Sequence, residues 1–139
     1  QQPEILFIVS AGNNGRDIDT HPVFPAAFAL ENMIVVTSLT ETGKIAPGSN
    51  WGKISVDIGV PAEQLSARDY RGLVRPVRGS SFAVPRVAAL AAHLKAENPT
   101  WTGKEIKAEI LALAEPLPNR NEILLLKSGW ISNRKLNQY

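Results

Sequence analysis

Residues 79–85 read Gly-Ser-Ser-Phe-Ala-Val-Pro and lead directly into a long run of small apolar side chains. From residue 82 to residue 94 only two polar side chains interrupt that run, which predicts a helix buried on nearly all sides at the centre of the protein. Pro85 is tolerated only in the first turn of a helix, so the helix is expected to begin near Ser81.

A serine at the start of a helix lies beside free backbone N–H groups and the positive end of the helix dipole. For Ser81 that position favours nucleophilic chemistry, because the same N–H groups can hold the oxyanion that attack on a carbonyl creates. An ordinary serine N-cap is the commoner explanation for a serine that leads a helix. The rest of the sequence decides between the two interpretations.

Short apolar runs alternate with helical patterns along the chain. The predicted strands are residues 5–9, 33–39, 54–60 and 73–74. A short helical turn is expected at residues 25–29, and a second helix begins with the capping pair Thr102 and Glu105 and stops before Pro116. This alternation predicts an α/β fold with a mainly parallel sheet, and one face of that sheet is expected to be short of helices.

A loop of small residues, Ser-Ala-Gly-Asn-Asn-Gly at positions 10–15, follows the first predicted strand. In open α/β sheets, ligands bind at the carboxyl ends of the strands. The side-chain amide of Asn13 can therefore donate to a developing oxyanion and complement the backbone N–H of Ser81. An isolated Asn-Gly loop is usually a plain turn. Its combination with a serine that leads a buried helix favours the catalytic interpretation.

Composition adds few constraints. The 139 residues suffice for one domain, and the formal net charge is only +2. The one basic cluster lacks interleaved aromatic residues, so we interpret it as a solvated loop and expect no nucleic-acid partner; it consists of Arg68, Arg71, Arg75 and Arg78. No apolar stretch approaches the length of a membrane span, and the chain has no cysteine. The pattern Asp17-x-Asp19-x-His21 is interpreted as a solvated loop in preference to a metal site, and no cofactor is expected.

Two motifs resemble those of a known family, the subtilisin-like serine peptidases. Residues 10–15 resemble the family's oxyanion segment, and residues 79–85 resemble its nucleophile motif Gly-Thr-Ser-Met-Ala-x-Pro. Further segments match in collinear order, namely residues 24–26, 32–36, 56–61, 98–102 and 128–131. The resemblance implies that residues 1–139 form the C-terminal portion of a subtilisin-like peptidase domain, with a partial three-layer α/β fold.

The resemblance also implies a role for each matching residue. Ser81 would be the nucleophile that becomes acylated, and Asn13 would stabilise the tetrahedral oxyanion together with the Ser81 N–H. The residues implied to contact the peptide or protein substrate, through their backbone or as walls of its specificity pocket, are Ser10, Ala11, Gly12 and Phe24. The resemblance favours a secreted or periplasmic location.

The sequence departs from the family's pattern in one important way. The motifs that carry the family's catalytic aspartate and histidine, of the types Asp-Thr/Ser-Gly and His-Gly-Thr-His, lie upstream in the family and do not occur here. His93 falls twelve residues along the helix from Ser81, about 18 Å at helical rise, and His21 lies in a polar loop. A serine without an oriented base is a weak nucleophile, so this chain alone should be inactive. The implied partner is the N-terminal half of the catalytic domain.

Milder departures are a serine at position 80 in place of the family's threonine and Arg86 in place of a frequent histidine. Two alternatives to the peptidase stay open. In the first, the fold is kept as a non-catalytic binding or scaffold module, which the missing motifs favour. In the second, residues 12–15 cradle a phosphate, but their spacing fits neither Gly-x-Gly-x-x-Gly nor a P-loop.

Overall fold

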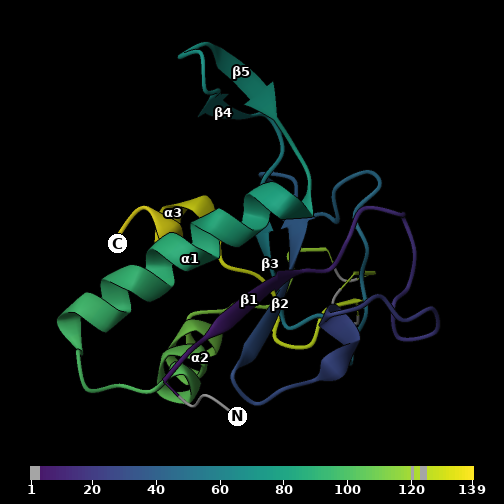
Figure 1. The fold of residues 1–139 in the computed structure, drawn as a ribbon. Helices are drawn as coiled ribbons and strands as arrows, with labels where there is room; N and C mark the ends of the chain where they lie inside the picture. The colour runs from purple at the N-terminus through teal and green to yellow at the C-terminus, as the bar shows by residue number, and fades with distance from the viewer. Residues whose placement is uncertain (1–3, 120, 123–124) are drawn as a thin grey trace.

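The centre of the protein is a parallel sheet of three strands, β1 (Phe7–Ser10), β2 (Met33–Leu39) and β3 (Ile58–Pro61), in the order β1-β2-β3. A computed structural model describes residues 4–119, 121–122 and 125–139 (Figure 1). Every residue of β2 is buried, as its run of β-branched and apolar side chains predicts for a central strand. The predicted α/β fold with a mainly parallel sheet is confirmed.

The two longer helices lie on the same face of this sheet. Helix α1 (Ser80–Glu97) and helix α2 (Gly103–Ala112) share a core with the side chains of Ile34 and Val36, which point to one side of β2. The alternate β2 residues face the opposite side, where loops and the short helix η1 (Ala26–Phe28) cover them. Within the described residues the second face therefore carries no long helix, as expected.

Local sequence signals account for the helix ends. The predicted capping box at α2 is confirmed: the Glu105 N–H donates to the Thr102 hydroxyl, and the Glu105 carboxylate accepts from the Thr102 N–H. Helix α1 extends beyond the predicted residues 82–94 at both ends. It continues to Glu97 because Lys95, Ala96 and Glu97 are good helix formers. The side chain and the backbone N–H of Asn98 both donate to Leu94 O and close its last turn.

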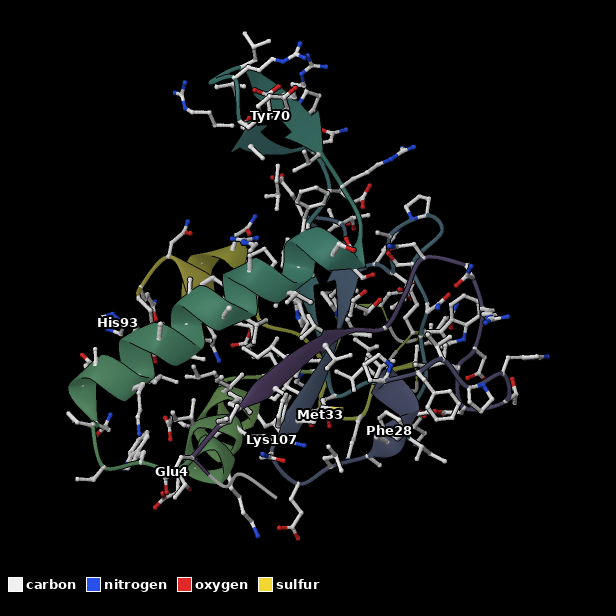
Figure 2. The ribbon with its side chains drawn as sticks, viewed as in Figure 1. Glu4, Phe28, Met33, Tyr70, His93 and Lys107 are labelled. Carbon is white, nitrogen blue, oxygen red and sulfur yellow. The ribbon has the colours of Figure 1, made fainter. Side chains whose placement is uncertain are left out.

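A two-stranded hairpin precedes α1 and projects from the body of the protein (Figure 1). It consists of β4 (Leu65–Arg68) and β5 (Val74–Val77) in antiparallel pairing. The strand predicted at residues 73–74 corresponds to the start of β5, whereas β4 was not predicted. Tyr70 lies at the tip of this hairpin and is 88% exposed (Figure 2).

The strand predicted at residues 54–60 begins later than expected. Ile54 is 77% exposed, and the N–H groups of Ile54 and Ser55 donate to the Asp19 carboxylate. These bonds hold the chain in a turn, so that β3 starts only at Ile58.

The predicted closing strand at residues 128–131 is a single bridge beside β3. The Gly59 N–H donates to Gly129 O over 2.9 Å, and the Ile131 N–H donates to Gly59 O over 3.0 Å. Of the apolar run predicted at residues 123–126, residues 123–124 lie outside the described part of the chain. The short helix α3 (Asn133–Leu136) follows and lies near α1. No helix in the described residues combines the length and the apolar character that crossing a membrane requires.

Candidate functional site

Ser81 lies in the first turn of α1 and is exposed. In the part of the chain that the structure describes, neither its hydroxyl nor its backbone N–H has a hydrogen-bond partner. The residue before the helix, Gly79, has φ of 106°, a conformation that residues with a side chain avoid. A Cβ on Gly79 would also lie 3.1 Å from Oδ1 of Asn13. The glycine of the motif therefore allows both the turn into the helix and the close approach of the loop.

The side chain of Asn13 lies at the same helix end. Both the backbone N–H and the hydroxyl of Ser80 donate to Asn13 Oδ1, over 3.0 Å and 2.9 Å. Because a backbone N–H can only donate, the Asn13 atom that faces it must be the carbonyl oxygen. The Asn13 Nδ2 has no partner among the described residues, and the side chain is exposed. The structure thus places the amide donor of Asn13 and the hydroxyl of Ser81 at one helix N-terminus.

Asn50 organises the loop that carries Asn13, and sequence reasoning gave it no functional role. Its buried side chain donates from Nδ2 to Ala11 O over 2.8 Å and accepts at Oδ1 from the N–H groups of Asn14 and Arg16. Its backbone N–H donates to Gly12 O over 3.0 Å. The sequence offered only a weak signal, since an asparagine after Gly-Ser is also typical of a turn.

The first three residues of the predicted oxyanion segment, Ser10, Ala11 and Gly12, lie at the carboxyl end of β1. Ala11 is fully buried, and its N–H donates to Val36 O as a continuation of the sheet. The Gly12 N–H donates to the hydroxyl of Ser10 over 3.1 Å. The main chain of Ala11 and Gly12 is therefore largely bonded within the protein, whereas Ser10 is part of the edge strand.

Phe24 lies in the segment predicted to form a wall of the specificity pocket. It is 66% exposed and contacts Phe28, with the ring centroids 5.1 Å apart. The peptide bond between Phe24 and Pro25 is cis. A Cβ on Gly12 would lie 3.7 Å from Cγ1 of Val23, so the segment before Phe24 approaches the oxyanion loop.

Neither histidine is bonded to Ser81. His93 lies towards the far end of α1, where it pairs with Glu97 over 3.3 Å and contacts the ring of Tyr139 (Figure 2). His21 is exposed, and its Nδ1 shares a hydrogen bond with the hydroxyl of Thr20 over 2.9 Å. Among the described residues, neither histidine therefore accompanies the predicted nucleophile Ser81 and the predicted oxyanion donor Asn13.

Arg86, which stands where the family often has a histidine, joins α1 to its neighbours. Its Nη1 donates to Asn133 Oδ1 over 2.7 Å and to the backbone oxygen of Pro61. Burial lowers the pKa of Arg86, although a guanidinium remains charged at neutral pH. These contacts give Arg86 a structural role between β3, α1 and α3.

A cavity of about 420 Å³ lies between the hairpin, α1 and α3. Phe82 and Pro85 line this cavity, but Ser81 and Asn13 do not, so the cavity is separate from the predicted catalytic residues. Among residues 4–119, 121–122 and 125–139, no three metal-binding side chains come together.

The parallel sheet and the central helix define an α/β fold in which a serine begins the central helix. The sequence profile of the Subtilase family matches residues 1–130, and the chain belongs to this family. It is 32% identical over 113 residues to an alkaline serine exoprotease A from Vibrio alginolyticus, covering 81% of this chain and 20% of that protein. It is 27% identical to an M-protease from Shouchella clausii, covering 84% of this chain and 29% of the relative.

Solved structures show the same fold. A cold-adapted subtilisin-like serine proteinase superposes with a TM-score of 0.80 at 25% identity, over 93% of this chain and 45% of that one. The A-subunit of the AB5 toxin from E. coli gives a TM-score of 0.81 at 22% identity, over 96% of this chain and 50% of that one. The chain thus spans about half the length of these structures and less than a third of the two curated relatives.

Proposed function

We propose that this chain is the nucleophile-bearing part of a serine endopeptidase that cleaves peptide bonds through an acyl-enzyme at Ser81. The observation that carries the proposal is a pair of groups at one helix end, the Ser81 hydroxyl and the Asn13 amide nitrogen, which have no hydrogen-bond partner among the described residues. The family membership supports it.

In the proposed reaction, Ser81 Oγ attacks the carbonyl carbon of the substrate and its proton passes to a base. The Ser81 N–H and the Asn13 Nδ2 hold the negative oxygen of the tetrahedral intermediate. The intermediate collapses when the C–N bond breaks and the base returns the proton to the leaving amine. Water then hydrolyses the serine ester by the same steps and frees the enzyme.

The base is proposed to come from a complementary segment, the N-terminal half of the catalytic domain. One edge of β1 supports this partner, since among the described residues β1 pairs with β2 alone: the N–H groups of Phe7 and Ala11 point to β2, so the backbone groups of Ile8 and Ser10 point to the open side. Phe7 on this edge strand is 41% exposed.

Helix α1 offers a second surface to the same partner. Its exposed face carries small apolar residues at helical spacing, namely Pro85, Ala88, Ala89 and Ala92. Ser81 lies one turn before Pro85 on this face, so an element that covers the face would bring its side chains beside the nucleophile. We propose that the base is delivered in this way.

On the substrate side, we propose that Ser10, Ala11 and Gly12 form one wall of the specificity pocket and that Phe24 contributes an apolar wall. The internal bonds of Ala11 and Gly12 favour shaping of the pocket over direct main-chain contact with the substrate. A secreted or periplasmic location is part of the proposal and is checked by cell fractionation.

A fluorophosphonate probe on the full-length protein tests the proposed activity. Labelling should occur in the wild type and in the control Ser66→Ala, which removes another exposed hydroxyl, and should disappear in Ser81→Ala. A wild-type protein that stays unlabelled would instead support the alternative, a non-catalytic binding or scaffold module. That alternative is favoured by one observation: the sequence holds neither upstream catalytic motif. Reading the gene upstream of residue 1 tests for both motifs.

A further inference from the structure

Three side chains form a continuous line of hydrogen bonds from β1 to the proposed oxyanion site. The Gly12 N–H donates to Ser10 Oγ over 3.1 Å. Ser10 Oγ lies 2.7 Å from Ser80 Oγ, and Ser80 Oγ lies 2.9 Å from Asn13 Oδ1. Ser80 is fully buried, so water cannot replace these contacts freely.

The direction of each bond follows from the number of protons. Asn13 Oδ1 has no hydrogen, so the single hydroxyl proton of Ser80 must point towards it. The contact between Ser10 and Ser80 therefore requires the proton of Ser10. Ser10 therefore donates to Ser80, and Ser80 donates to Asn13. Because Asn13 Oδ1 faces Ser80, the Nδ2 of the same amide faces outwards.

We infer that Ser10 is a positioning residue, which acts through Ser80 to hold the Asn13 amide with its Nδ2 towards the reacting carbonyl. This inference rests on the proposed role of Asn13 in the oxyanion site. The proposed function places Ser10 in the wall of the specificity pocket, whereas this inference assigns its hydroxyl to the bond with Ser80.

Ser10 is suited to this task because it restrains Asn13 from two sides. Its oxygen accepts from Gly12, the residue directly before Asn13, and its proton goes to Ser80, which bonds the Asn13 side chain. Its own backbone is fixed in the sheet opposite Val36. A rigid strand thus determines where an exposed amide points.

Nuclear magnetic resonance tests the inference without any need for catalysis. In the full-length protein labelled with 15N-asparagine, relaxation of the Asn13 side-chain NH2 should report an ordered group in the wild type. Ser10→Ala should increase its mobility, and Ser10→Thr should restore the order because it keeps the hydroxyl. Ser49→Ala is the matched control, since it also removes a serine hydroxyl, and the buried Ser49 hydroxyl has no partner in the described residues. An unchanged Asn13 amide in Ser10→Ala would overturn the inference, even in a protein that hydrolyses nothing.

Kinetics of the full-length protein give the second test. Ser10→Ala should lower kcat about 3- to 10-fold, the effect expected when one hydrogen bond is lost, and leave KM unchanged. In an Asn13→Ala background, Ser10→Ala should cause no further loss, because its effect passes through that amide. A loss of equal size in both backgrounds would mean that Ser10 only supports the fold, and the inference would fail while the proposed function stood.

Discussion

Ser80 and Ser81 are adjacent, yet the structure buries the first completely and exposes the second. Successive residues of a helix point about 100° apart, which follows from 3.6 residues per turn. Ser80 therefore turns towards Asn13 in the loop after β1, while Ser81 turns outwards. The Ser80 hydroxyl thus holds the Asn13 side chain, whereas the Ser81 hydroxyl is left accessible for the proposed attack on a substrate.

The first prediction concerns Ser81→Ala in the full-length protein. Turnover should fall by several orders of magnitude, because the other hydroxyl of the motif, that of Ser80, is fully buried and cannot reach a substrate. The free energy of unfolding should stay within about 0.5 kcal/mol of the wild type, since the hydroxyl is exposed and unbonded. Initial rates and urea unfolding measure the two quantities. Retained turnover would exclude Ser81 as the nucleophile.

The second prediction concerns Asn13→Ala. Removal of the amide should lower kcat about 10²- to 10³-fold with little change in KM, a magnitude taken from the loss of the corresponding donor in a subtilisin rather than calculated from this chain. The substitution also leaves the two donors of Ser80 without an acceptor, which should cost about 1–3 kcal/mol of stability.

Asn14→Ala is the matched control for this loop. Asn14 is the next residue and is also exposed, and its contact with Asn50 is made by its backbone N–H, which alanine keeps. Kinetics and unfolding curves for the two alanine variants should therefore differ clearly. Equal effects of the two substitutions on kcat would show that the conformation of the loop, and not the Asn13 amide, determines kcat.

The sequence predicted the elements whose pattern is local. The apolar run at residues 33–39 became β2 over the same residues, and the capping pair Thr102 and Glu105 formed as expected. Strand β4 was missed because Leu65–Arg68 has only four residues, none of them β-branched or aromatic, and is held by its pairing with β5. The early start predicted for β3 was wrong because Asp19, distant in sequence, holds Ile54 in a turn.

In the candidate site, too, features formed by neighbouring residues could be predicted, and contacts between residues distant in sequence could not. The motif around Ser81 could be read from the sequence because a helix start and its glycine are neighbours along the chain. The role of Asn50 could not, since its three side-chain bonds reach back more than thirty residues to the loop around Asn13. Hydrogen bonds of this kind leave no periodic pattern.

The third prediction concerns the shape of the oxyanion loop. Gly12 has φ of 94°, and a Cβ there would lie 2.7 Å from the Asn50 Nδ2 that bonds Ala11. Gly12→Ala should therefore destabilise the protein by about 1–3 kcal/mol and displace the loop.

Gly48→Ala separates the two causes of that loss. Gly48 has φ of 84°, but a Cβ there would meet no atom within 4 Å. The Gly48→Ala variant should lose only the stability that the strained backbone conformation costs. Its unfolding free energy should therefore fall less than that of Gly12→Ala. Equal losses in chemical denaturation would show that the contact with Asn50 contributes nothing.

The last prediction concerns acid stability and the carboxylate of Asp19. Desolvation raises its pKa, but the hydrogen bonds from Ile54 and Ser55 together outweigh that effect, and the pKa of Asp19 is lowered in the folded protein. A lowered folded pKa means that the unfolded chain binds the proton more readily, so the stabilisation is present above the unfolded pKa of about 4 and is lost as the pH falls through the folded pKa.

Asp19→Asn should therefore reduce stability at pH 7 and flatten its decline below about pH 4, because the amide keeps one acceptor oxygen but no longer titrates. Unfolding midpoints between pH 7 and pH 2 measure this difference. Glu41→Gln is the control, since Glu41 is an exposed carboxylate without a hydrogen bond in the described residues, and it should follow the wild-type curve. An acid-induced decline as steep in Asp19→Asn as in the wild type would show that the turn before β3 is held by contacts other than this carboxylate.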